Sequence, residues 1–238
     1  MPSPLARRCT PAADLESSRH VKPEELPTIL PLFPLEQPLL LPGTVVPFLT
    51  DGPATRNLVE DALDADRYIA VVQPLETTFG SAPLKGQPFV YAVGCLGYIG
   101  ETHEPEPDQY LVLAGGIIRF RVVGEAPCLR GYRRVVVDYG EFVDDPDLVE
   151  EELDFLVLKN LVRQRIESND TDLDLTIMDR MAGTEIVTAI AHAIPLSPAE
   201  RQVLMETPSL RELETVLLQL MAGPGGLPSF DCALPPPS

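Results

Sequence analysis

Near the amino end of the chain, proline interrupts the apolar positions every few residues. Residues 30–35 read Leu-Pro-Leu-Phe-Pro-Leu, and residues 39–48 read Leu-Leu-Leu-Pro-Gly-Thr-Val-Val-Pro-Phe. Because proline lacks a backbone N–H and disfavours helix interiors, this run cannot form one helix. It predicts two short strands joined by a Pro-Gly turn, in which Gly43 is free to adopt a positive φ.

From residue 28 to residue 140 the pattern predicts mainly strands, with one helix that opens at Asp51-Gly52-Pro53. In the segment 117–123 apolar residues alternate with Arg119 and Arg121, as in a strand with one solvated face. Several short strands at this spacing predict a barrel-like lobe. The expected strands are residues 44–49, 68–72, 89–97, 110–113, 117–123 and 132–139, with a polar hairpin loop at 101–108.

From residue 144 onward the apolar residues recur at helical spacing, which predicts four helices. Ser197 and Glu200 form a capping box with proline at the first helical position, and Ser209 with Glu212 repeats that signature. The expected helices are residues 145–167, 176–194, 198–206 and 209–221.

These patterns divide the chain into four parts and predict an α+β fold. We expect a flexible tail at residues 1–26, a β-barrel lobe at 27–143, a helical bundle at 144–222 and a proline-rich tail at 223–238. No apolar run is long enough for a signal peptide or a membrane span, so a cytoplasmic protein is expected.

The net charge of −18, from 36 acidic and 18 basic residues, disfavours binding to nucleic acid and to anionic membranes. The four cysteines, Cys9, Cys95, Cys128 and Cys232, have no zinc-ribbon spacing. They are interpreted as reduced thiols.

The order of several segments resembles the amino-terminal domain of Lon proteases. The leucine-proline opening comes first, then residues 60–71, 91–97 and 113–120, and finally residues 190–206 with the phrase Leu-Ser-Pro-Ala-Glu-Arg-Gln-Val-Leu-Met-Glu. The resemblance covers most of residues 27–222 and implies a PUA-like β-barrel followed by a helical bundle. In full Lon proteases this region contributes to substrate engagement and hexamer organisation. Here the resemblance implies that this domain stands alone, without motor or protease.

Two short sequences are similar to catalytic motifs but lack the required residues. In residues 80–87 the glycine and the lysine are not at the positions that a phosphate-binding loop requires. The Lon peptidase site contains Asp-Gly-Pro-Ser, but residues 51–54 have Ala54 where the serine nucleophile would be. We therefore expect neither ATPase nor peptidase activity, and no cofactor.

The remaining candidate chemistry is weak. His20, His103 and His192 are far apart in sequence, and His103 with its neighbouring glutamates could form at most a weak cation site, so no metal site is predicted. The acidic block at residues 144–174 could stabilise a helix amino terminus, where negative charge is favourable, or form a docking surface for a basic partner.

The favoured hypothesis is a non-catalytic module that binds polypeptide, through an apolar groove between the two lobes or through a strand edge. The candidate contacts are Leu39, Leu40 and Leu41, because a proline-flanked loop is not expected to bury all three. The alternative is that these leucines belong to the core. Other hypotheses are a small hydrolase, for which no nucleophile and base are found, and RNA binding through a basic cluster of Arg119, Arg121, Arg130, Arg133 and Arg134.

Overall fold

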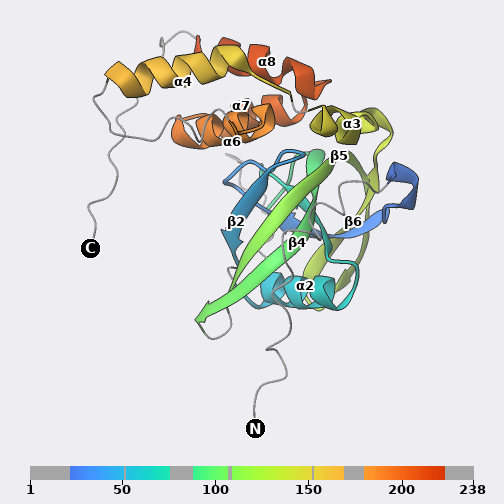
Figure 1. The fold of residues 1–238 in the computed structure, drawn as a ribbon. Helices are drawn as coiled ribbons and strands as arrows, with labels where there is room; N and C mark the ends of the chain where they lie inside the picture. Colours follow the sequence, from blue (N-terminus) through green and yellow to red (C-terminus); the bar gives the residue numbers. More distant parts are fainter. Residues whose placement is uncertain are drawn as a thin grey trace.

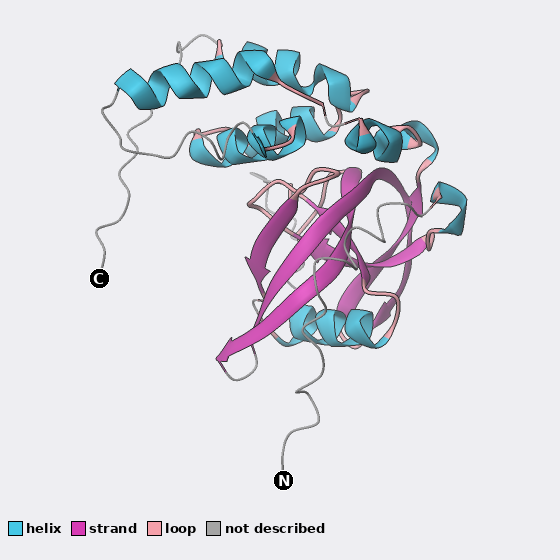
Figure 2. Ribbon diagram, in the orientation of Figure 1, coloured by secondary structure: helices cyan, strands magenta, loops and turns pink. Residues whose placement is uncertain are grey.

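The computed structural model describes residues 22–50, 52–75, 88–106, 109–151, 153–168 and 180–222. It is a mixed α+β structure in two parts (Figures 1 and 2). The strands wrap around one part of the core, α2 covers one end of them, and the carboxyl-terminal helices stack over the opposite end. A single cluster of buried apolar side chains runs through both parts.

Six strands form one sheet whose pairings close on themselves. Each of β5, β4, β3, β1 and β6 pairs with the next, and β6 pairs again with β5, while β2 is added beside β5. Among the described strands, only β1 and β3 are paired in parallel. The strands are β1 (Ile29–Pro34), β2 (Val45–Leu49), β3 (Tyr68–Val72), β4 (Val93–Glu106), β5 (Gln109–Leu129) and β6 (Tyr132–Asp138).

The proline-rich opening forms β1 and β2, as the sequence predicts, and Gly43 has a φ of 81°. The two strands do not pair with each other, because β1 lies between β3 and β6 while β2 pairs with β5. Helix α2 (Pro53–Asp64) also begins where predicted, and its face of Leu58, Val59 and Ala62 is buried.

The predicted loop at residues 101–108 is wrong in its described part, because β4 continues to Glu106 and β5 starts at Gln109. The predicted strands 110–113 and 117–123 are both parts of the single strand β5. Polar residues can extend a strand when a partner satisfies their backbone groups, and here Glu101 and His103 pair with Leu113 and Leu111.

Arg119 does not lie on a solvated face of its strand. Its side chain is fully buried, because the helical part covers this end of β5 and supplies the carboxylate of Asp145 at 2.7 Å. The prediction of an exposed arginine holds two residues further along the strand, since the Arg121 side chain is about half exposed. The burial of Arg119 therefore depends on a residue that is 26 positions away in sequence.

The helical part begins as predicted but is more divided. The helix expected at 145–167 is two helices, and the second has its first amides satisfied by the Glu214 carboxylate, which accepts from Val157 N–H and Leu158 N–H at 2.9 and 3.1 Å. Residues 176–179 of the next predicted helix lie outside the described residues. The helices are α3 (Asp145–Glu150), α4 (Leu156–Ser168), α6 (Gly183–Ala193), α7 (Pro198–Met205) and α8 (Leu213–Met221). The short 3-10 helices are η1 (Pro23–Glu25), η2 (Gly140–Phe142) and η3 (Leu210–Glu212).

The end of the predicted amino-terminal tail belongs to the folded part. Residues 23–25 form η1, and Leu26 is buried in the core cluster. Tyr139 anchors the next residue, because its hydroxyl donates to the Pro27 carbonyl at 2.7 Å. Residues 23–26 are therefore not part of a flexible tail, and residues 1–21 lie outside the described residues.

Candidate functional site

A groove of about 620 Å³ separates β2 from α6, where the strand part meets the helical part. We call it the β2–α6 groove. Most of its surface is apolar, and among the described lining residues the ionisable groups are one glutamate and one histidine, both from α6. It is lined by Pro38, Thr44, Val45, Val46, Pro47, Met181, Glu185, Thr188, Ala189 and His192.

Strand β2 forms one wall of this groove and is an edge of the sheet. It pairs with β5 on one side, and no described strand pairs with its other side. At its two ends, the Thr44 carbonyl accepts from Gly116 N–H at 2.8 Å, and Thr50 N–H donates to the Tyr110 carbonyl at 2.9 Å. Backbone groups alternate between the two sides of an antiparallel strand, so even-numbered residues face β5. The residues whose backbone groups face the open side are Val45, Pro47 and Leu49.

Pro47 determines what this open edge can offer. Proline has no N–H, so the edge presents two N–H groups, from Val45 and Leu49, and three carbonyl groups. The proline is tolerated because its nitrogen points away from β5, where no ladder bond is lost. It also limits uncontrolled pairing with other edges. The side chains of Val45 and Leu49 are 45% and 50% exposed.

Helix α6 forms the opposite wall, and its Thr188 has an unusual environment. The side chain is 8% exposed, and its Oγ1 is the one buried side-chain polar atom in the described part of the chain that has no hydrogen-bond partner. Leaving a hydroxyl buried and unpaired is unfavourable. Glu185, one turn earlier, accepts a hydrogen bond from Ala182 N–H at 2.9 Å and thereby caps the helix. The groove therefore combines apolar walls with one unused hydroxyl.

Leu39, Leu40 and Leu41 do not line this groove. All three are buried, with exposures of 3%, 1% and 0%, so the expectation that one would be exposed is wrong and the core alternative holds. The loop is held against β5, where the Gly43 N–H donates to the Gly116 carbonyl at 2.9 Å. Gly116 makes this approach possible, because a Cβ there would lie 2.1 Å from the Leu41 carbonyl oxygen.

A second hollow, of about 510 Å³, borders the other end of β2. The rings of Phe33 and Phe48 meet there, with centroids 4.4 Å apart, and Leu49 and Glu36 lie on its walls. The chain segment that contributes Glu36 continues to Pro38 in the β2–α6 groove. Both hollows therefore border the same edge strand.

The five arginines of the predicted basic cluster do not form a free basic surface. Arg119 pairs with Asp145, and Arg121 pairs with Glu141 at 2.7 Å. The Arg121 guanidinium lowers the pKa of the Glu141 carboxyl. Two more also have carboxylate partners: Arg130 pairs with Glu60 and Asp61, and Arg133 pairs with Glu125.

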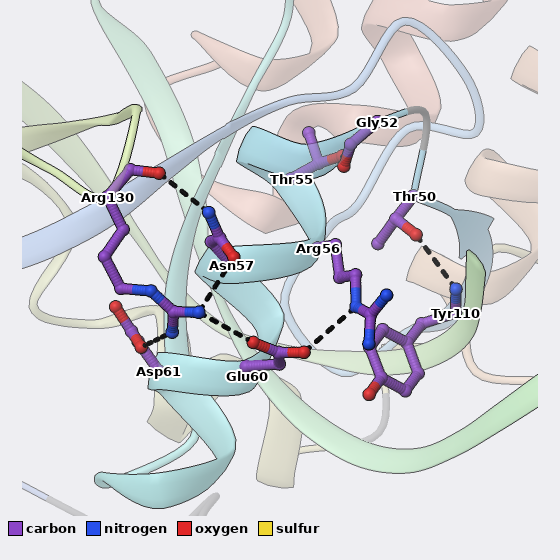
Figure 3. Close-up of polar contacts among 9 residues, drawn as sticks. All are labelled: Thr50, Gly52, Thr55, Arg56, Asn57, Glu60, Asp61, Tyr110 and Arg130. Carbon is purple, nitrogen blue, oxygen red and sulfur yellow. Dashed lines mark hydrogen bonds and ion pairs between the residues drawn. The ribbon is translucent and has the colours of Figure 1, made fainter. Parts of the chain in front are cut away.

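Figure 3 shows how Arg130 is held against α2. Its guanidinium donates to Asn57 Oδ1 and to Glu60 Oε2, both at 2.9 Å, and Asn57 Nδ2 donates back to its carbonyl at 2.9 Å. Glu60 lies between two guanidiniums, since Arg56 Nε donates to its other oxygen at 3.0 Å. The same cluster buries the Tyr132 hydroxyl, which donates to Asp61; burial and this bond raise its pKa to about 12. These contacts fasten the turn between β5 and β6 to α2.

The other candidate residues named from the sequence do not form a site in the described part of the chain. Among the described residues, no group of three or more His, Cys, Asp or Glu side chains is placed to hold a metal ion. His103 lies on β4 and His192 on α6. Ala54 lies in the first turn of α2, while the loop at 80–87 and His20 fall outside the described residues. Within the described ranges, no helix is both long and apolar enough to span a membrane.

Sequence comparison matches the chain to bacterial Lon proteases. It is 29% identical over 219 residues to Lon protease 2 of Myxococcus xanthus, covering 84% of this chain and 24% of that protein. It is 28% identical to the Lon protease of Anaeromyxobacter dehalogenans, again with 84% and 24% coverage. The chain thus spans about a quarter of the length of these curated relatives.

Structural comparison establishes the fold. A Lon N-terminal domain protein from Xanthomonas campestris superposes with a TM-score of 0.54 at 23% identity, covering 82% of this chain and 98% of that one. The N-terminal domain of a Mycobacterium avium complex Lon protease gives 0.58 at 16% identity, with the same coverage. A family model, the ATP-dependent protease La (LON) substrate-binding domain, matches residues 29–223, and the chain therefore belongs to this family.

Proposed function

We propose that this chain is a non-catalytic module that binds unfolded polypeptide, with the β2–α6 groove as its contact surface. The observation that carries the proposal is the match of residues 29–223 to a substrate-binding domain of a protease. The groove supports it, because an apolar cleft beside an unpaired strand edge is a common way to hold an extended peptide.

The proposal includes the architecture expected from the sequence. The closed ring of strand pairings supports a PUA-like barrel at residues 27–143, and the helices from α3 to α8 support a carboxyl-terminal bundle at 144–222. The partner is a polypeptide in the cytoplasm rather than a nucleic acid or a membrane.

RNA binding remains the second candidate, and the arginine pairings weigh against it. Phosphate binding needs basic side chains that are free to exchange counterions, yet four of the five candidate arginines already face carboxylates. The net charge of −18 adds long-range repulsion of a polyanion.

A catalytic role has no supporting constellation in the described residues. The hydroxyl of Ser197 donates to Glu200 Oε2 at 2.8 Å, within a helix cap rather than beside a general base. Lys159 forms an ion pair with Asp154 at 2.7 Å. We therefore propose that the function requires neither ATP hydrolysis nor peptide cleavage by this chain.

Fluorescence anisotropy tests the proposal with three labelled probes. These are reduced, carboxamidomethylated lysozyme, which stays unfolded and gains no negative charge from the modification; native lysozyme; and a short single-stranded RNA. We expect saturable binding of the unfolded protein alone. Saturable RNA binding that weakens steeply with salt would favour the second candidate. If no unfolded polypeptide binds, the proposed function is wrong.

A further inference from the structure

We propose that the bound polypeptide adds a strand to the open edge of β2, with Thr188 as an additional hydrogen-bond partner. This inference rests on the proposed function and specifies its binding mode. The occupant is an extended segment with apolar residues at alternate positions and a neutral to basic charge.

The open edge of β2 offers a short row of backbone hydrogen-bonding groups in which one N–H donor is missing. Val45 and Leu49 each present an N–H and a carbonyl, and Pro47 presents a carbonyl alone. The distance from Val45 to Leu49 is about 14 Å at the usual rise of an antiparallel strand. An added strand would accept at both ends of β2 and donate to all three carbonyls. Its alternate side chains could enter the two hollows that border β2.

Thr188 is the observation that points independently to a ligand. Its hydroxyl is buried in the wall that faces β2 and has no partner among the described residues. The hydroxyl has almost no accessible surface, so the Thr188 side chain must rotate toward the groove before a backbone carbonyl or N–H of an added strand can supply the missing bond. A purely aliphatic ligand would leave this hydroxyl without a hydrogen bond and would therefore be disfavoured.

The charge of the groove and of the whole chain favours some polypeptide segments over others. No lysine or arginine lines the β2–α6 groove in the described part of the chain, whereas Glu185 does. The whole chain carries a net charge of −18, so an acidic segment would be repelled during approach. A segment with basic residues between its apolar positions complements both features.

Pro47→Val tests the edge directly, because it adds an N–H to the open side and leaves the ladder with β5 intact. We expect a short peptide of alternating valine and lysine to bind about two- to tenfold more tightly, as one added hydrogen bond would give. Pro105→Val, on the exposed part of β4, is the matched control and should leave affinity unchanged.

N-methylated peptides test the ladder from the ligand side. Two versions carry methyl groups on alternate residues, one on the odd and one on the even positions, with identical side chains. Strand addition predicts that one version loses about tenfold or more in affinity while the other binds nearly as well as the parent. Equal loss in both versions would contradict pairing at an edge.

Thr188 is tested by two substitutions. Thr188→Val removes the hydroxyl at constant shape and should weaken peptide binding about two- to tenfold without lowering the melting temperature. Thr188→Ser retains the hydroxyl and should preserve binding.

Failure of this inference is distinguishable from failure of the proposed function. If wild-type protein binds carboxamidomethylated lysozyme but Pro47→Val, Thr188→Val and N-methylation have no effect, strand addition is wrong and polypeptide binding stands. If the wild type binds no unfolded polypeptide, both the proposed function and strand addition are wrong.

Discussion

Arg119 and Asp145 form a buried, two-pronged ion pair that joins the strand part to the helical part. Arg119 Nη2 donates to Asp145 Oδ1 at 2.7 Å and Arg119 Nε donates to Oδ2 at 2.8 Å, while both side chains are almost fully buried. The same guanidinium donates to the carbonyls of Met205, the last residue of α7, and of Thr207, and it lies 4.4 Å from the Phe142 ring centroid. One side chain on β5 thus contacts the start of α3 and the end of α7.

We expect Asp145→Asn and Arg119→Met each to destabilise the protein by about 3–5 kcal/mol, because each leaves a buried group without its charged partner. Urea unfolding followed by circular dichroism measures this change. Arg121→Ala is the matched control, since its pair with Glu141 is exposed and should contribute at most about 1 kcal/mol. Equal losses for Arg119→Met and Arg121→Ala would show that Arg119 does not join the two parts.

Gly116→Ala should destabilise the protein by about 1–3 kcal/mol or more, because the new Cβ would lie 2.1 Å from the Leu41 carbonyl oxygen. Backbone, rather than a flexible side chain, would have to move. Gly124→Ala in the same strand is the control, since its Cβ would meet no atom closer than 4.0 Å. Thermal unfolding compares the two, and a neutral Gly116→Ala would mean that the loop at 39–44 is not held as described.

Ser197→Ala should cost about 1 kcal/mol, or about 2–4 °C in melting temperature, because the hydroxyl caps α7 by accepting from Glu200 N–H at 3.2 Å. Peptide affinity should be unchanged, since the cap stabilises the helix and lies outside the groove lining. If the variant instead lost an activity at unchanged stability, Ser197 would be a nucleophile and the non-catalytic proposal would be wrong.

The same cap predicts a pH dependence. The Ser197 backbone N–H, and then its hydroxyl, hold the pKa of the Glu200 carboxyl below its ordinary value. A depressed pKa in the folded state contributes stability that is complete above the unfolded pKa, about 4.3, and is lost as pH falls through the folded value. The stability difference between wild type and Glu200→Gln should therefore be full at neutral pH and shrink below about pH 4. A difference that stayed constant through this range would show that the carboxylate is not held by the cap.

Leu26 should contribute to stability although it adjoins the amino-terminal segment. Leu26→Ala should cost about 2 kcal/mol or more, because the side chain is 5% exposed within the core cluster. Removal of residues 1–21 should change the free energy of unfolding by less than about 0.5 kcal/mol. Chemical denaturation of both variants checks this contrast; a large loss on removing residues 1–21 would mean that the preceding segment also packs.

The sequence alone predicts the local elements whose signals span only a few residues. Proline at the first helical turn predicts α2, the Ser197 and Glu200 pair predicts the start of α7, and the Pro-Gly turn predicts the positive φ of Gly43. The order of motifs also indicated the family, because it samples the whole chain rather than one segment.

Packing between distant segments fixes which of these residues are buried and which surface is open. Leu39, Leu40 and Leu41 are in the core because β5 has a glycine where the loop crosses it, and Arg119 is buried because Asp145 meets it from another part of the chain. The β2–α6 groove was foreseen only as a cleft between lobes; its residues, and the unpaired Thr188 hydroxyl, follow from the way α6 packs beside an edge strand. Burial depends on contacts between distant segments, and alternation along one segment does not encode them.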